Sequence, residues 1–583
     1  MINKLSTNVN SNSKYQINNT RNRNANSKSP SFNGVGDSLI KGVQFCEKNP
    51  MLNVAVIDLA TAIIPRSIFE SFTNIFAGFE AFRREASGLV VNCLIPGFLA
   101  LGAAKLTNKF VMGDKADLST CWAGKDGIDA ISEHYTKAHE TAAYAEGMAK
   151  YSDPTKARVY ATHYNILSSA KGVDGNETKK FSEIVGLNKS SVAEKLTEAT
   201  FEEKPKLSFM ERMKGMFSKK SVSKVSEAYE QAARATHITE NVTFGTGKKA
   251  VVSDLKSMMN NTSSFLRGVV KEGASTPEQM ASIAKRAKKL VNTKSGIAMA
   301  IILPLAASMQ YINRAITKKM SGVDGAPIYN DYGKDKPKIE KTPEQVKAEK
   351  EALLKQKFIS IGSMVGVACL SMMKLPTLST LKNIFQFKGQ YPTMDQARAI
   401  STVTFGSRMA VADDKNELAE ATGRDIVTFS SMYFLGDYAA KGYASHLEST
   451  QGAKLLNRTK PLEKGANIFK KIGNWVVNTH LKSTDELVAS ATHSLEDMRK
   501  LRAKCQMANL GSSLIILGLL VPVYTRMKTA KNHQKELEAA KLTQANQPNF
   551  TSQKNIAQQN LTKPQFTSNS HVFQAFKQQV ESK

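Results

Sequence analysis

Four long stretches without a charged residue constrain this chain more than any other feature. They comprise residues 86–104, 295–313, 358–373 and 506–525, which are 19, 19, 16 and 20 residues long. About 20 predominantly apolar residues cross the hydrocarbon core of a bilayer, and about 18 without charge make a candidate span. Three stretches reach that length, and 358–373 falls just short of it. We therefore predict membrane-embedded helices, with the central helices of a large soluble bundle as the competing interpretation.

The composition of these four apolar runs also favours lipid. Pro96, Pro304 and Pro522 lie inside three of them, and helices in membranes tolerate proline better than soluble helices do. Small residues recur in the runs, including the pair Gly362 and Gly366, and small residues let helices approach closely in lipid.

Basic residues flank all four runs on both sides. The positive-inside rule requires an asymmetry between alternate loops, so the orientation in the membrane stays open. A cation near an anionic membrane surface gains about 1 kcal/mol, and we expect anionic headgroups to bind these flanks. The expected anionic-lipid contacts are Arg83, Arg84, Lys285, Arg286, Lys288, Lys289, Arg499, Lys500, Arg502 and Lys504.

Helix-start motifs precede three of the runs. Residues 276–279 and 342–345 both read Thr-Pro-Glu-Gln, and residues 483–486 read Ser-Thr-Asp-Glu. In a capping box the hydroxyl at the N-cap and the Glu or Gln three residues later each satisfy a free backbone N–H. Each motif therefore predicts the start of a helix that continues into the next apolar run. Thr393 and Gln396 have the same spacing and predict another helix start.

Upstream of the first run, residues 51–80 are apolar but interrupted by Asp58, Arg66 and Glu70. Apolar side chains recur at helical spacing between residues 67 and 76, which is typical of an amphipathic helix. We expect this face to pack against the body of the protein rather than lie in a membrane interface.

The two ends of the chain predict disorder. The first 36 residues contain no acid, are dense in Asn and Ser, and lack the apolar core of a cleavable secretory signal peptide. The far end, from about Thr543, is rich in Gln, Asn and Ser. Neither composition buries enough apolar surface to offset the entropy of ordering the chain.

The sequence contains no recognisable catalytic or metal-binding motif. His134 and His139 are five residues apart, so on one helix their imidazoles would diverge. Val242 stands where a phosphate-binding loop ending at Lys248 would need glycine. We expect no catalytic, cofactor-binding or metal site, and a protein that is not an enzyme.

The net charge of +29 predicts an anionic partner. Nucleic-acid binding proteins interleave basic clusters with aromatics or carry a recognisable motif. Here the basic residues gather beside the apolar runs, which favours a lipid bilayer with anionic headgroups over nucleic acid; protein partners stay unknown.

Together these patterns predict a mostly α, multi-helix, membrane-embedded protein with helical extramembrane regions and disordered N- and C-terminal tails. The expected regions are 1–38, the disordered leader; 39–106, the amphipathic segment and first apolar helix; 107–274, helical and extramembrane; 275–376, two capped helices entering apolar runs; 377–482, helical and extramembrane; 483–532, a capped helix and the fourth run; and 533–583, the disordered tail.

The expected role is that of an integral membrane protein with a non-enzymatic structural, scaffolding or membrane-organising function. Two alternatives stay open. One is a secreted protein that inserts into a target membrane, and the other is a soluble basic helical bundle that binds an anionic partner such as nucleic acid.

Overall fold

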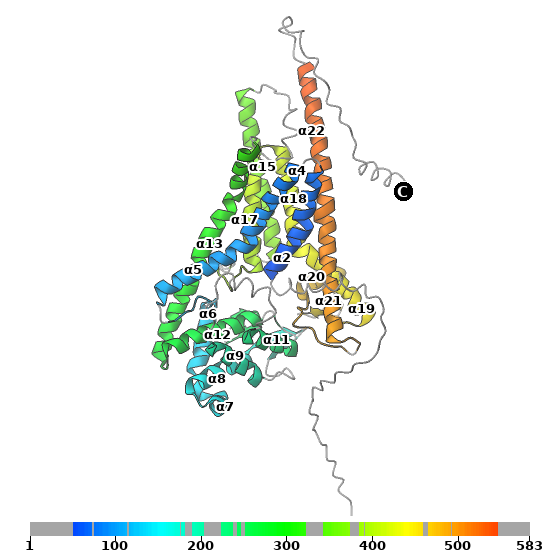
Figure 1. Ribbon diagram of the computed structural model, residues 1–583. Coiled ribbons are helices and arrows are strands. Elements are labelled where there is room, and N and C mark those ends of the chain that lie inside the picture. Colours follow the sequence, from blue (N-terminus) through cyan, green and yellow to red (C-terminus); the bar gives the residue numbers. More distant parts are fainter. Residues whose placement is uncertain are drawn as a thin grey trace, which may run out of the picture.

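The computed structural model describes residues 50–545 except 73–74, 114–115, 175–176, 181–188, 203–222, 237–238, 240–241, 246–250, 322–341, 373–383, 390, 459–464 and 491. The described chain is mostly helical, as predicted. A bundle of long helices stands on a compact domain of shorter ones (Figure 1). The predicted leader and residues 546–583 of the predicted tail lie outside the described residues. Residues 533–545 are helical, so the disorder prediction is wrong for that part of the tail.

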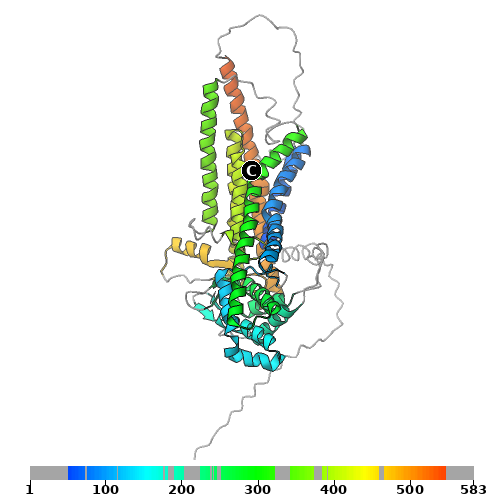
Figure 2. The same cartoon turned by 90° about the vertical axis from the view of Figure 1, so that its left-hand side faces the viewer.

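Four long helical stretches contain the four apolar runs. They are α4 (Ile75–Leu89) continued through a π-helical turn η2 (Val90–Leu94) into α5 (Ile95–Val111); α13 (Pro277–Ser321); α15 (Pro343–Met372); and α21 (Leu495–Ser513) continued through η7 (Leu514–Leu520) into α22 (Val521–Ala545). All four are long and apolar enough to cross a membrane. They run side by side, and successive ones alternate in direction (Figures 1 and 2).

Less apolar helices fill the space between the long ones. They are α2 (Pro50–Asp58), η1 (Leu59–Ile63) and α3 (Ile64–Ser71); α17 (Met394–Ala410); and α18 (Lys415–Ser430), η6 (Ser431–Leu435) and α19 (Gly436–Gln451). Although we predicted residues 377–482 as extramembrane, α17 packs on α13 and α15, and α18 packs on α15 and α22. Met364, Met409 and Phe429 are among the buried residues that join these helices.

The compact domain follows α5 in the chain. Its helical elements are α6 (Lys125–Thr136), η3 (Ala138–Glu140), α7 (Ala142–Tyr151), α8 (Pro154–Ser169), α9 (Lys189–Phe201), α11 (Lys224–Thr236) and α12 (Leu255–Glu272). One core runs from Met112 to Val291 and includes the first turns of α13, where Met280 and Leu290 are buried. A single helix, α13, therefore belongs both to the compact domain and to the bundle.

Short strands complete the compact domain. They are β1 (Lys171–Asp174), β2 (Glu177–Lys180), β3 (Val242–Phe244) and β4 (Val251–Ser253), in the antiparallel order β2-β1-β3-β4. In this register, Gly172 lies opposite Lys179 and Thr243 lies opposite Val252. Strands of three or four residues are too short to show an alternating pattern, so the sequence predicts none of them.

A second pair of strands lies beyond α19. β5 (Leu456–Arg458) and β6 (Thr479–Leu481) pair antiparallel and flank the helix α20 (Ile468–Asn478). In Figure 2, α20 projects sideways from the foot of the bundle, crosswise to the long helices.

The capping motifs have different outcomes. The backbone N–H of Gln279 donates to Thr276 Oγ1, and Gln279 Oε1 accepts from the Thr276 N–H. The same exchange joins Thr342 and Gln345, so both Thr-Pro-Glu-Gln helix starts are confirmed, as is the one at Thr393. The prediction at residues 483–486 is wrong. Those residues form a turn, and α21 begins at Leu495 behind its own capping box at Ser494.

The apolar face of the amphipathic segment does not pack as we expected. Ile68, Phe72, Ile75 and Phe76 are all exposed at the tip of the α3–α4 hairpin. The polar face turns inward instead, because Glu70 is buried against Arg526 of α22.

A buried histidine makes the compact domain sensitive to acid. His163 of α8 is buried, and its Nε2 lies 3.2 Å from Thr200 Oγ1. Burial lowers the pKa of His163 from 6.5 to about 3. Below pH 6.5 this histidine is protonated in the unfolded chain, whereas in the folded domain it stays neutral down to about pH 3. Between these two pH values, His163 should therefore lower the free energy of unfolding by about 1.4 kcal/mol for each pH unit that the pH falls.

The prediction can be checked by thermal unfolding between pH 7 and about pH 5. His163→Leu should lose less stability than the wild type as the pH falls. His139→Leu, at an exposed site of the same domain, should follow the wild type. Parallel curves for His163→Leu and the wild type would contradict the account.

Candidate functional site

Charged residues gather at the end of the bundle that lies away from the compact domain. Glu85 directly precedes the first apolar run, Arg314 follows the second, Lys357 precedes the third and Arg526 follows the fourth. Because successive long helices alternate in direction, these four boundaries meet at one level (Figures 1 and 2). We call the ion-paired residues at this level the charged layer: Arg66, Glu70, Glu85, Arg314, Arg408, Asp413, Glu417, Arg424, Asp425 and Arg526.

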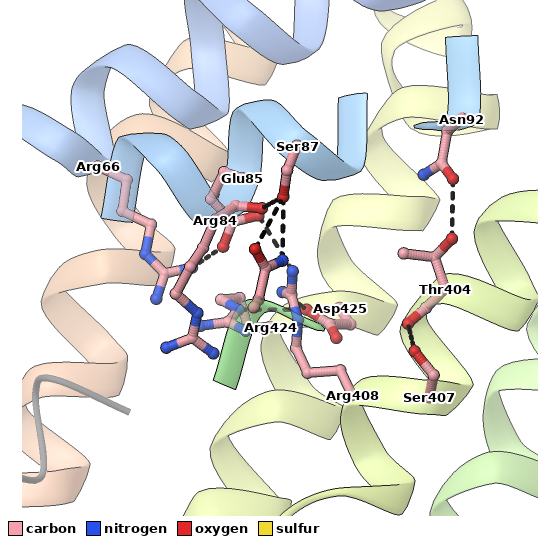
Figure 3. A network of polar contacts seen from close by, with 11 residues as sticks. Arg66, Arg84, Glu85, Ser87, Asn92, Thr404, Ser407, Arg408, Arg424 and Asp425 are labelled. Atoms are coloured by element: carbon pink, nitrogen blue, oxygen red, sulfur yellow. Dashed lines mark hydrogen bonds and ion pairs between the residues drawn. The ribbon is translucent and has the colours of Figure 1, made fainter. Parts of the chain in front are cut away.

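The centre of the charged layer is a chain of ion pairs around Arg408 (Figure 3). Arg408 Nη1 donates to Asp425 Oδ1 at 2.8 Å, and Arg408 Nη2 donates to Glu85 Oε2 at 3.2 Å. Glu85 Oε1 accepts from Arg66 Nη1 at 2.7 Å, and Asp425 Oδ1 also accepts from Arg424 Nε at 3.2 Å. The side chains of Arg408 and Asp425 are 8% and 1% exposed. These contacts tie α3, α4, α17 and α18 together.

Further pairs extend the layer to the remaining helices. Arg526 Nη2 of α22 lies 2.9 Å from Glu70 Oε2 and 3.1 Å from the Phe69 carbonyl of α3. Arg314 of α13 pairs with both Asp413 and Glu417 at the start of α18. In addition, Lys357 Nζ of α15 donates to the Ala410 carbonyl of α17 at 2.8 Å. Every long helix of the bundle is therefore attached to an inner helix at this level.

The charged layer is balanced, with five acids and five arginines. A buried charge is costly in an apolar surrounding unless it is paired and hydrogen-bonded. The layer borders a cavity of about 40 Å³, lined in part by Asp58, Glu85 and Arg408. That volume accommodates water but is far below the several hundred Å³ of a small-molecule site. The arrangement holds the helices together.

Neutral polar contacts continue below the charged layer. Thr404 Oγ1 of α17 donates to Asn92 Oδ1 of η2 at 2.8 Å, and Ser401 Oγ lies 2.8 Å from the Tyr433 hydroxyl of η6. Ser431 of η6 reaches Ser513 at the end of α21. The π-helical turns η2 and η6 supply Asn92, Ser431 and Tyr433 to this region, and such turns are frequent at functional sites.

The predicted lipid contacts at the far end of the bundle take part in helix packing. Arg83 Nη1 and Nη2 donate to Asn313 Oδ1 and Thr317 Oγ1 of α13, at 3.1 and 3.0 Å. Arg84 lies half-buried beside the charged layer (Figure 3). Their acidic neighbours Glu70, Glu85 and Asp425 were missed as site residues. For Glu70 the sequence does contain a signal: Asp58, Arg66 and Glu70 fall on one face of an otherwise apolar helix.

The remaining predicted contacts lie at the end of the bundle near the compact domain. Arg286 pairs with Glu272, Lys288 with Asp129, Arg499 with Glu230 and Lys500 with Glu496, and Arg502 Nε donates to the Lys482 carbonyl at 2.5 Å. Lys285, Lys289 and Lys504 are exposed. Headgroup binding stays a prediction, and these three exposed lysines are the residues most available for it.

No family model, curated protein or solved structure matches this chain. Among the residues that the structure describes, no group of three or more His, Cys, Asp or Glu is placed to hold a metal ion.

Proposed function

We propose that this chain is an integral membrane protein whose four long helices cross a bilayer, and that it acts as a non-enzymatic scaffold. One observation carries the proposal: the most apolar part of each long helix faces outward. In the most apolar 18-residue stretch of each long helix, between 11% and 39% of the residues are buried inside the protein. The central helices of a soluble bundle would bury such stretches instead.

The outward apolar side chains form a belt around the bundle. We call this set the apolar belt: Phe98, Leu106, Ile301, Ile312, Phe358, Ile359, Leu370, Ile515, Leu520 and Tyr524. A soluble monomer rarely exposes an apolar surface of this extent. The residues of the charged layer turn the other way, toward the inner helices, as expected where the surroundings are lipid.

The link between bundle and compact domain supports a scaffolding role. α13 is one helix of 45 residues, and it is buried first among the helices of the compact domain and then against α5 and α17. At the junction, the buried Lys294 Nζ donates to the Ser119 carbonyl at 2.9 Å and lies 3.7 Å from the centre of the Trp122 ring. A continuous helix clamped on both sides holds the domain at a fixed position against the membrane.

Fractionation of membranes from cells that express the chain tests this proposal. We expect detergent to release the protein and alkaline carbonate or high salt to leave it in the pellet. Release by carbonate or high salt would contradict the proposal and favour the soluble basic bundle. A soluble form that lyses liposomes after purification would favour the secreted membrane-inserting protein instead.

A further inference from the structure

α20 differs from the other described helices of the bundle in having no buried residue and an exposed first half. None of its eleven residues is buried. Ile468, Phe469 and Ile472 are all exposed, with Phe469 at 80%. Large apolar side chains that lie exposed next to one another mark a surface that contacts a partner or a membrane.

Five of the six large apolar side chains of α20 share one face. At 100° per residue, Ile468, Phe469, Ile472, Trp475 and Val476 fall within an arc of about 120°. The opposite arc contains Lys470, Lys471, Asn474 and Asn478, together with Val477. Between residues 465 and 482 there are three lysines and no acid. A short helix with an apolar face, a basic face and a tryptophan is typical of the boundary between lipid and water.

The fold holds α20 in a fixed place. β5 and β6 pair on either side of it in the chain, Lys441 Nζ of α19 donates to the Val476 carbonyl at 3.4 Å, and Trp475 Nε1 donates to Ser445 Oγ at 3.4 Å. The helix lies crosswise to α13 and α15, at the end of the bundle where the compact domain begins (Figure 2). This is the level at which the apolar runs end on that side, so α20 continues the apolar belt at its rim.

We infer that α20 is an interfacial helix that lies in the plane of the membrane on the side of the compact domain, with Ile468, Phe469 and Ile472 among the acyl chains and its lysines at anionic headgroups. The inference rests on the proposed membrane insertion. Its consequence is a defined depth and orientation: α20 fixes the membrane surface against which the compact domain stands.

Nitroxide labels measure this directly in the full chain, with its native cysteines replaced by Ser, reconstituted in vesicles of phosphatidylcholine and phosphatidylglycerol. A label at Phe469→Cys should collide with oxygen several-fold more, relative to a water-soluble nickel complex, than a label at Asn474→Cys. In the chain labelled at 469, the further substitution Ile472→Asp places a charge on the apolar face and should move the label from lipid into water. The control substitution Asn478→Asp, on the polar face, should leave the label in lipid.

A third label, at Ile359→Cys in the apolar belt, tests membrane insertion of the bundle separately from the interfacial position of α20. Lipid exposure at 359 together with water exposure at 469 would overturn the interfacial helix and leave membrane insertion standing. Water exposure at both positions would overturn both. Spin–spin broadening at 469 that disappears on dilution with unlabelled chain would show a second copy on this face, and would also overturn the inference.

Discussion

Replacing Arg408 by leucine is expected to destabilise the bundle by about 3–5 kcal/mol, the range found when one partner of a buried ion pair is removed. Arg408 bridges Asp425 and Glu85 and is itself 8% exposed. Without Arg408 the charged layer has five acids and four arginines, so one negative charge is left without a matching positive charge. Asp425, at 1% exposure, keeps only the contact to Arg424 that the structure already shows at 3.2 Å. Denaturant unfolding of the detergent-solubilised protein measures the loss.

The matched control is Arg458→Leu. Arg458 Nη2 lies 2.6 Å from Glu448 Oε2, but its side chain is 57% exposed, and exposed pairs contribute about 0–1 kcal/mol. The double variant Arg408→Leu with Asp425→Leu should recover part of the loss, because it removes both charges. If Arg408→Leu cost no more than Arg458→Leu, the charged layer would not be holding the bundle together.

Two glycines of α19 should respond to the same substitution with opposite signs. A β-carbon on Gly436 would lie 2.0 Å from Asn509 Oδ1 and 2.8 Å from Asn509 Cγ of α21. Asn509 is buried and its Oδ1 accepts from Ser513 Oγ, so it has little freedom to move. Gly436→Ala should therefore destabilise the protein by about 1–3 kcal/mol, the usual cost of overpacking.

Gly442, six residues further along α19, is exposed, and a β-carbon there would meet nothing within 4 Å. Gly442→Ala should raise stability by about 0.5–1 kcal/mol, because alanine lowers the entropy cost of the helix. Thermal unfolding of the two variants side by side decides the question. A shift in the same direction for both would contradict the close approach of α19 and α21.

The sequence was sufficient to predict the long helices because their signals are local. An uncharged run identifies each of them, and the start of α15 follows from the capping box at Thr342. The box at Ser483 forms only in part: Glu486 Oε2 accepts from the Ser483 N–H at 2.7 Å, but the Glu486 N–H donates to the Ser483 carbonyl and closes a turn. Glu486 is also buried, and its Oε1 accepts from Thr239 of the compact domain, a tertiary contact that the local motif does not reveal.

The charged layer was out of reach for a different reason. Its partners are far apart in the chain: Arg408 and Glu85 are 323 residues apart, and Arg526 and Glu70 are 456 apart. The flanking arginines were visible, but only the alternating direction of the helices brings acids from α3, α4 and α18 beside them. α17 and α18 look like ordinary polar helices because they pack against the long helices on several sides.

The central claim, that the four long helices cross a bilayer, is tested most directly by sidedness. Two single-cysteine chains carry Glu140→Cys, in the compact domain, and Lys347→Cys, near the start of α15; both positions are exposed. A membrane-impermeant maleimide added to sealed vesicles of one orientation should label one of the two and reach the other only after detergent. Equal labelling of both before detergent would place them on the same side and contradict the account.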